Sequence, residues 1–221
     1  MQTSALVPAW DRIDTVLVDM DGTLLDLAFD NFFWLELVPA KYADLHGLSA
    51  DEAQRRLTAR FESTVGTLAW YCTDHWSRDL GLDINALKWA HKHRIALLPG
   101  AREFLAAVRA RGKRLWIVTN AHQETIAVKT EQTGVHALVD RVICSHELSA
   151  PKESQQFWHA LQHEQPFDPS RTLLIEDSLL VLAAASAYGV RHAIAIRRPD
   201  SRLPPRQIAD YPAVDGVAEL V

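Results

Sequence analysis

The stretch Thr15-Val16-Leu17-Val18-Asp19-Met20-Asp21-Gly22-Thr23 indicates how this chain of 221 residues folds. Its first four residues are apolar or β-branched, and an uninterrupted run of this kind suits a strand buried on both faces of a parallel sheet. Asp19 and Asp21 follow at the carboxyl end of that strand, where open parallel sheets bind their ligands. We therefore expect a buried strand that carries two aspartates into a binding site.

Similar short apolar segments recur further along the chain. They span residues 114–118, 141–144, 172–175 and 193–196, and helical patterns over residues 100–111, 122–133 and 178–188 lie between them. A glycine follows each helical pattern, which is a common way to end a helix. Because strands and helices alternate, the sequence predicts an α/β fold with a Rossmann-like, doubly wound parallel sheet.

Residues 27–98 interrupt this alternation with helical patterns and no credible strand. Ser49 and Glu52 have the spacing of a capping box, which opens a helix. Residues 67–80 predict one helix that ends at Gly81, and Asp83 is expected to cap the next helix. We expect a catalytic core of residues 1–26 and 99–221 and an inserted, all-helical cap of residues 27–98.

Composition excludes several classes of protein. The 23 basic and 28 acidic residues give a formal net charge of −5 without a long basic run, so no nucleic-acid partner is expected. The longest weakly polar stretch, residues 179–190, is too short to cross a bilayer, so no membrane partner is expected either. Residues 1–4 lack the start of an export signal, which favours a cytoplasmic protein. As a separate expectation, the protein is either a monomer or a homodimer. Cys72 and Cys144 fit no metal or redox spacing and are expected to be free thiols.

Polar side chains gather at the predicted carboxyl ends of the strands. They comprise carboxylates, one hydroxyl, one amide and one ammonium group: Asp19, Asp21, Thr119, Asn120, Lys152, Glu176 and Asp177. Carboxylate oxygens are preferred ligands of Mg²⁺, and so dense a cluster of carboxylates would repel itself without a cation. The sequence therefore predicts a Mg²⁺ site beside a site for one phosphoryl group.

These residues belong to four motifs that resemble those of the haloacid dehalogenase superfamily. In chain order the motifs are Asp19-Met20-Asp21-Gly22-Thr23, Thr119-Asn120, Lys152, and Ile175-Glu176-Asp177-Ser178. The resemblance spans residues 14–196, and the helical insertion resembles the cap of that superfamily. It implies a phosphatase whose substrate is a small phosphate ester.

The resemblance also implies a role for each motif residue. Asp19 would attack phosphorus, Asp21 would act as general acid and base, and Lys152 would offset negative charge during catalysis. Thr119, Asn120 and Lys152 would bind the phosphoryl group. The Asp19 and Asp177 carboxylates and the Asp21 backbone carbonyl would bind Mg²⁺. Glu176 stands where many relatives have aspartate or glycine, so its contact with the metal could be direct or through water.

The cap is expected to select the substrate, because it faces the leaving group. Ten of the chain's 18 aromatic residues lie within residues 27–98. Residues 24–34, Trp70-Tyr71-Cys72 and Thr119-Asn120-Ala121-His122 resemble the bacterial GMP/IMP nucleotidase branch of the superfamily, which implies purine nucleoside monophosphates as substrates. The residues expected to contact substrate are Phe29, Asp30, Asn31, Phe32 and His122.

Other functions stay open at this point. A phosphatase of sugar phosphates or other small esters, or a phosphomutase, would use the same four motifs. A catalytically inactive protein that binds a phosphate ligand would have no need of a second aspartate at position 21. Dehalogenation has no use for Asp21 or for a metal ligand at Asp177.

Overall fold

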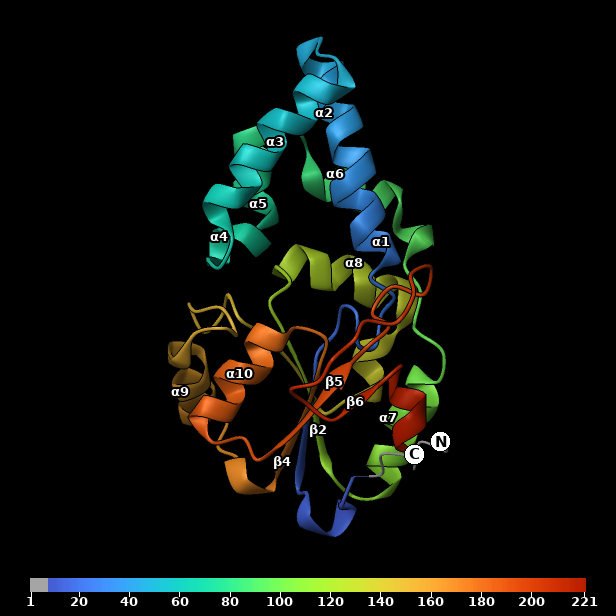
Figure 1. Ribbon diagram of the computed structural model, residues 1–221, viewed down its shortest axis with the longest axis vertical. Coiled ribbons are helices and arrows are strands. Elements are labelled where there is room, and N and C mark those ends of the chain that lie inside the picture. Colours follow the sequence, from blue (N-terminus) through green and yellow to red (C-terminus); the bar gives the residue numbers. More distant parts are fainter. Residues whose placement is uncertain (1–7) are drawn as a thin grey trace.

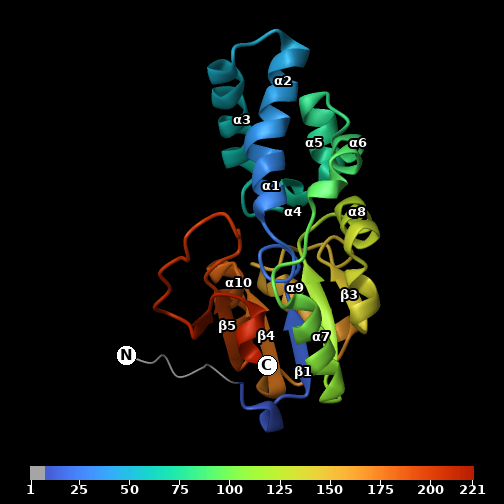
Figure 2. The ribbon, with the colours of Figure 1, turned by 90° about the vertical axis from the view of Figure 1, so that its right-hand side faces the viewer.

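Six strands form one parallel sheet within residues 8–221, the part of the chain that the computed structural model describes (Figures 1 and 2). In chain order they are β1 (Thr15–Val18), β2 (Arg114–Thr119), β3 (Arg141–Cys144), β4 (Thr172–Glu176), β5 (His192–Ile196) and β6 (Ala213–Val214). In the sheet they lie in the order β3-β2-β1-β4-β5-β6, which is the Rossmann order. The predicted α/β fold is confirmed, and the two-residue β6 adds a strand that the sequence did not predict.

Helices cover both faces of this sheet because β1 is apolar on both sides. Val16 and Val18 belong to one hydrophobic cluster, and Leu17, between them, belongs to a second. The first cluster includes residues of α7 (Ala101–Ala110) and α8 (Gln123–Thr133), and the second includes residues of α9 (Gln155–Glu164) and α10 (Leu179–Tyr188). Figure 1 shows α9 and α10 on one side of the sheet and α7 on the other. The sheet is thus covered by helices on both faces, with the carboxyl ends of its strands at one edge.

A group of helices lies beyond those carboxyl ends, at one end of the molecule in both views (Figures 1 and 2). They are α1 (Ala28–Phe32), the π-helical turn η2 (Phe33–Leu37), α2 (Val38–His46), α3 (Ala50–Thr64), α4 (Leu68–Tyr71), α5 (Thr73–Leu80), α6 (Ile84–Ala90) and the turn η3 (Lys92–Arg94). Ser49 accepts a hydrogen bond from the Glu52 amide, and Asp83 accepts one from the Ala86 amide, as predicted. These helices occupy the segment expected to form the cap; its domain boundaries stay a prediction.

The single helix predicted over residues 67–80 is wrong. The backbone becomes extended at Cys72 (φ −86°, ψ 109°), which ends α4 and begins α5. The Cys72 thiol accepts a hydrogen bond from the His75 amide at 3.4 Å, and the Trp76 indole donates to the Trp70 carbonyl at 2.8 Å. These two contacts satisfy backbone groups that a continuous helix would have paired.

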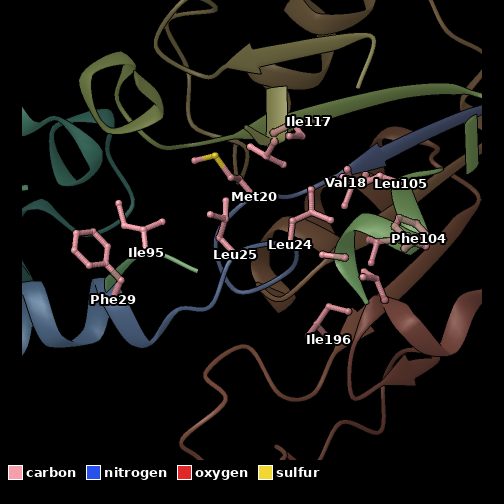
Figure 3. Packing of buried hydrophobic residues seen from close by; sticks show 14 of the residues in the cluster. Val18, Met20, Leu24, Leu25, Phe29, Ile95, Phe104, Leu105, Ile117 and Ile196 are labelled. Atoms are coloured by element: carbon pink, nitrogen blue, oxygen red, sulfur yellow. The ribbon is translucent and has the colours of Figure 1, made fainter. Parts of the chain in front are cut away.

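The loop after β1 connects the core with the cap helices. Met20, Leu24 and Leu25 are buried there in the same cluster as Phe29 of α1 and Ile95, which follows η3 (Figure 3). The loop therefore packs against both the sheet and the cap. The first aspartate motif is thus held between two packed layers.

Four further short turns complete the elements of this part of the chain: η1 (Trp10–Arg12), η4 (Val135–Leu138), η5 (Pro169–Arg171) and η6 (Val217–Leu220). Among the described helices, none is both long and apolar enough to cross a membrane. Residues 1–4, from which the lack of an export signal was argued, lie outside the described residues. A cytoplasmic location and the oligomeric state stay predictions.

Candidate active site

The candidate site lies where the strand order reverses, between β1 and β4. The Asp19 amide, just after β1, donates to the Ile175 carbonyl of β4 at 3.0 Å. Glu176 is the last residue of β4 and Asp177 follows it. Carboxylate oxygens of Asp19, Glu176 and Asp177 lie within 4.8 Å of one another. Carboxyl ends at such a reversal are where doubly wound sheets bind ligands.

Gly22 allows the loop after β1 to approach Asp177 closely. Its φ is +86°, and a Cβ at this position would lie 2.9 Å from both Asp177 Cγ and Pro199 Cβ. The Gly22 amide donates to the Leu25 carbonyl at 2.7 Å, which closes the turn. A residue with a side chain would be strained here and would push Asp177 away, so the turn requires glycine.

Lys152 supplies positive charge to the acidic cluster. It follows β3 in the chain, is 2% exposed, and its ammonium group contacts Asp19 Oδ1, Glu176 Oε2 at 2.7 Å and the Val118 carbonyl at 3.0 Å. Burial alone would lower the pKa of Lys152, but the charges of Asp19 and Glu176 outweigh it and raise that pKa. Lys152 therefore stays charged between the two carboxylates.

Negative charge nevertheless remains in excess. Burial, together with the charge of Glu176, raises the pKa of Asp19 to about 8. Burial likewise raises the pKa of Glu176 to about 7, and burial with the charge of Asp19 raises that of Asp177 to about 7. Closely spaced carboxylates in a buried site are stabilised in their ionised form by a cation. This all-oxygen donor set fits Mg²⁺.

Asp21 is paired with a different lysine. Lys129 of α8 is 1% exposed, and its Nζ lies 2.6 Å from Asp21 Oδ1 and 2.7 Å from Asp30 Oδ2. Lys88 of α6 lies 3.5 Å from Asp30, and burial lowers its pKa to about 8. Burial raises the pKa of Asp21 despite the charge of Lys129, so this carboxyl holds a proton more readily than an exposed aspartate.

Lys129 and Lys88 were not among the residues predicted from the sequence, because single lysines within helical patterns are most often solvated. One signal was available for Lys129. It shares a face of α8 with Thr125 and Thr133, at intervals of four residues, and the structure buries that face.

Thr119 and Asn120 lie at the end of β2, as expected. The Thr119 hydroxyl oxygen accepts a hydrogen bond from the Ala121 amide at 3.0 Å. Asn120 accepts from the Lys152 amide at 2.9 Å and donates to Glu153 at 2.9 Å, and Glu153 accepts from the Tyr71 hydroxyl of α4 at 2.6 Å. This chain of hydrogen bonds ties the loop of Lys152 to the cap. Glu153 and Tyr71 were not among the predicted site residues.

A cavity of about 410 Å³ opens above these groups. Its floor includes Asp19, Asp21, Lys152 and Asp177, and its walls are aromatic side chains of the cap: Trp34, Phe61, Trp70, Tyr71 and Trp76. These rings pack edge to face, with centroids 5.0 Å apart for Phe61 and Trp76 and 5.6 Å apart for Phe61 and Trp70. The cavity thus joins a charged floor to apolar walls.

Helical periodicity explains why two of the five residues expected to contact substrate do not line the cavity. The residues that line the cavity from this segment are Leu27, Asp30, Asn31, Trp34 and Leu35, which share one face of a helix. Phe29 and Phe32 are not among the lining residues: Phe29 is 2% exposed in the hydrophobic core (Figure 3), and Phe32 packs under the Arg94 guanidinium. The structure therefore does not place these two residues to contact a substrate in the cavity.

Asp30 and Asn31, by contrast, reach the cavity. Asn31 donates to Asp200 at 2.8 Å. His122 lies beside the cavity without lining it, and its Nδ1 is 3.0 Å from the hydroxyl of Thr73, which does line it.

A sheet of this order, with buried carboxylates and a buried lysine at its reversal point, is typical of the active site of an α/β enzyme. Comparison with known proteins agrees: residues 13–189 match the haloacid dehalogenase-like hydrolase family. The chain is 40% identical over 213 residues to proteins named GMP/IMP nucleotidase YrfG from Escherichia coli (strain K12) and Shigella flexneri, with 96% of each chain covered.

A solved structure described as a HAD phosphatase, from Thermococcus onnurineus, has the same fold. It superposes with a TM-score of 0.77 at 24% identity and covers 94% of this chain and 95% of its own. The structure of CbbY from Rhodobacter sphaeroides in complex with phosphate gives a TM-score of 0.67 at 20% identity, covering 94% and 96%. The chain belongs to the haloacid dehalogenase-like hydrolase family, and it is a phosphomonoesterase.

Proposed function

We propose that this enzyme hydrolyses the 5′-phosphate of purine nucleoside monophosphates, GMP and IMP above all, with Mg²⁺ and through an aspartyl-phosphate intermediate. The observation that carries the proposal is the cavity, whose floor is charged and whose walls are aromatic. A phosphate group fits the charged floor, and a flat heterocycle stacks on the aromatic walls. The relatives named GMP/IMP nucleotidase, 40% identical over nearly the whole chain, support the same substrate class.

The side chains of Asp19 and Asp177 and the backbone carbonyl of Asp21 would hold Mg²⁺. Both carboxylate oxygens of Glu176 already have protein partners, since Oε2 accepts from Lys152 and Oε1 accepts from the Ser178 amide at 3.1 Å. These contacts favour a role for Glu176 through its charge or through water, with Asp19 and Asp177 as the direct carboxylate ligands. The ion would neutralise charge on the phosphoryl oxygens and on the attacking carboxylate.

Asp19 is the nucleophile in this proposal. Its carboxylate oxygen forms a bond to phosphorus while the bond from phosphorus to the leaving oxygen breaks. Lys152 contacts the same carboxylate and offsets the charge that builds up around it. The Thr119 hydroxyl oxygen accepts from a backbone amide, so its hydrogen is free to donate to a phosphoryl oxygen.

Asp21 moves the protons. It donates a proton to the leaving oxygen of the nucleoside, and it then removes one from the water that hydrolyses the aspartyl-phosphate. Burial favours the protonated form of Asp21, and Lys129 stabilises the ionised form left after the proton has gone. The Asp21–Lys129 pair therefore supports both halves of the reaction.

The experiment that tests the substrate class compares kcat/KM for a series of phosphate esters. The expected order is GMP or IMP, then AMP, then pyrimidine monophosphates, with ribose 5-phosphate far behind. Stacking rewards ring area, and the 6-oxo group shared by guanine and hypoxanthine is an acceptor that adenine lacks. If ribose 5-phosphate or another sugar phosphate matches GMP, the enzyme is a sugar-phosphate phosphatase instead.

A matched pair of variants locates the base. Trp70→Ala removes a cavity wall, whereas Trp89→Ala removes a tryptophan of α6 that is 39% exposed and is not among the cavity-lining residues. Loss of one stacking contact, worth about 1–3 kcal/mol, lowers kcat/KM for GMP about 5- to 150-fold. We expect that loss for Trp70→Ala only, with turnover of p-nitrophenyl phosphate retained. Equal effects of the two variants would contradict stacking on Trp70.

A further inference from the structure

Two histidines and a cysteine meet at the junction of cap and core. Cys72 separates α4 from α5 in the cap, His122 precedes α8 after β2, and His146 follows β3. The Cys72 sulfur and one ring nitrogen of each histidine lie within 4.8 Å of one another, and all three residues are partly buried. None of them is among the residues that line the substrate cavity. The cluster is thus separate from the acidic site.

Each of the two histidines has a ring nitrogen available to bind a metal ion. His146 Nε2 is buried and has no hydrogen-bond partner among the described residues. The two imidazole rings meet edge to face with centroids 5.0 Å apart. His122 Nδ1 lies 3.0 Å from the hydroxyl of Thr73. When Nδ1 donates this hydrogen bond, Nε2 keeps a lone pair that can bind a metal ion. Metal-binding histidines are commonly held in this way, with one nitrogen on an oxygen and the other on the ion.

We propose that Cys72, His122 and His146 bind a Zn²⁺ ion that joins the cap to the core. A thiolate and two imidazoles are the soft and borderline ligands that Zn²⁺ takes, and hard Mg²⁺ does not compete for them. Three protein ligands leave the fourth tetrahedral position to water. Zinc–ligand bonds of about 2.0–2.3 Å set ligand atoms about 3.5 Å apart, which these atoms, already within 4.8 Å of one another, reach by small side-chain movements. One ligand comes from the cap and two come from the core, so the ion fixes the cap over the cavity.

Cobalt substitution tests this site in the full chain. The protein is stripped with a chelator, dialysed and titrated with Co²⁺, and its absorption spectrum is recorded. We expect one Co²⁺ per chain to give intense tetrahedral d–d bands and a thiolate-to-cobalt charge-transfer band. Co²⁺ in the acidic cluster has only oxygen ligands and gives no charge-transfer band, so the two sites are distinguished.

Two serine variants form the matched comparison. Cys72→Ser removes the thiolate but keeps a residue well suited to capping α5, so the fold is retained. Cys144→Ser changes the other cysteine, whose thiol donates to the Ala121 carbonyl at 3.2 Å, and leaves the three ligands in place. The charge-transfer band should disappear in Cys72→Ser and persist in Cys144→Ser. His146→Gln should weaken Zn²⁺ binding at least about 100-fold in competition with Co²⁺.

Three results would overturn the proposal. The first is a wild-type spectrum without a charge-transfer band. The second is a band that survives in Cys72→Ser, and the third is Zn²⁺ affinity that is unchanged in His146→Gln. Because these readouts do not use turnover, they are independent of which phosphate ester the enzyme hydrolyses.

Discussion

Replacing Lys129 by methionine should destabilise the protein far more than loss of an ordinary helix lysine. Methionine keeps the unbranched apolar stem but removes the ammonium group that lies 2.6 Å from Asp21 and 2.7 Å from Asp30. Two carboxylates would then face each other, with Lys88, 3.5 Å from Asp30, as the nearest remaining ion-pair partner among the described residues. The free energy of unfolding should therefore fall.

The size of the loss follows from the burial of the network. Removing one partner of a buried ion pair costs about 3–5 kcal/mol. Lys129 is 1% exposed, but the side chains of Asp21 and Asp30 are 21% and 17% exposed, so water has partial access to these side chains, although Asp21 Oδ1 itself is buried. Because water has this access and Lys88 remains near Asp30, we expect a loss near the lower end of the 3–5 kcal/mol range, at about 3 kcal/mol.

The loss of unfolding free energy in Lys129→Met should become smaller as the pH falls. Burial raises the pKa of Asp30, but Lys129 and Lys88 outweigh it and hold that pKa below its usual value. A carboxyl with a lowered pKa stabilises the folded state above its unfolded pKa, and that stabilisation is lost as the pH falls through the folded pKa. The difference between wild type and Lys129→Met should therefore be largest near neutral pH and should shrink below about pH 4.

Urea unfolding followed by circular dichroism measures these differences. Lys88→Met is the matched control, because Lys88 is also buried but makes a single longer ion pair, and its lowered pKa makes it easier to discharge. Asp30→Asn should restore part of the loss when it is added to Lys129→Met. A loss below about 1 kcal/mol for Lys129→Met, as at a surface pair, would refute the argument. So would a double variant no more stable than Lys129→Met.

Three further predictions concern the reaction, and a fourth concerns the pH dependence of metal binding. Asp19→Asn should lower kcat by at least about 10⁴-fold with an unchanged circular dichroism spectrum; a tenth of wild-type activity would exclude a covalent role for Asp19. Asp21→Asn should cost about 10²–10⁴-fold with GMP and less with p-nitrophenyl phosphate, whose leaving group needs no proton; equal losses would remove Asp21 from the acid role. Chelation should abolish activity, and Mg²⁺ should restore it better than Ca²⁺. Because burial raises the pKa of Asp19 to about 8 and those of Glu176 and Asp177 to about 7, Mg²⁺ should raise Tm more at about pH 8 than at about pH 5.5.

The sequence alone determined five of the six strands, three helices of the core and the position of the motifs along them, but not β6 or α9. The run from Thr15 to Val18 can be satisfied only by burial on both faces, and the glycines after the helical patterns end helices by local backbone geometry. Asp19, Thr119, Glu176 and Asp177 stand at or just after strand ends in the sequence itself. In a parallel sheet these ends must lie at one edge, so the approximate site followed as well.

The tertiary structure alone decided which side chains face the cavity and which groups meet across it. Periodicity groups Asp30 with Trp34 and separates both from Phe29, but it does not say which of these faces borders a cavity and which enters the core. Lys129 looks like a solvated lysine until Asp21 and Asp30, each distant in sequence, are brought to its ammonium group. The same holds for Cys72, which meets two histidines of the core only because the cap folds back over the sheet. Local sequence encodes backbone preference and amphipathic spacing, whereas the charge and coordination around a side chain depend on contacts between distant segments.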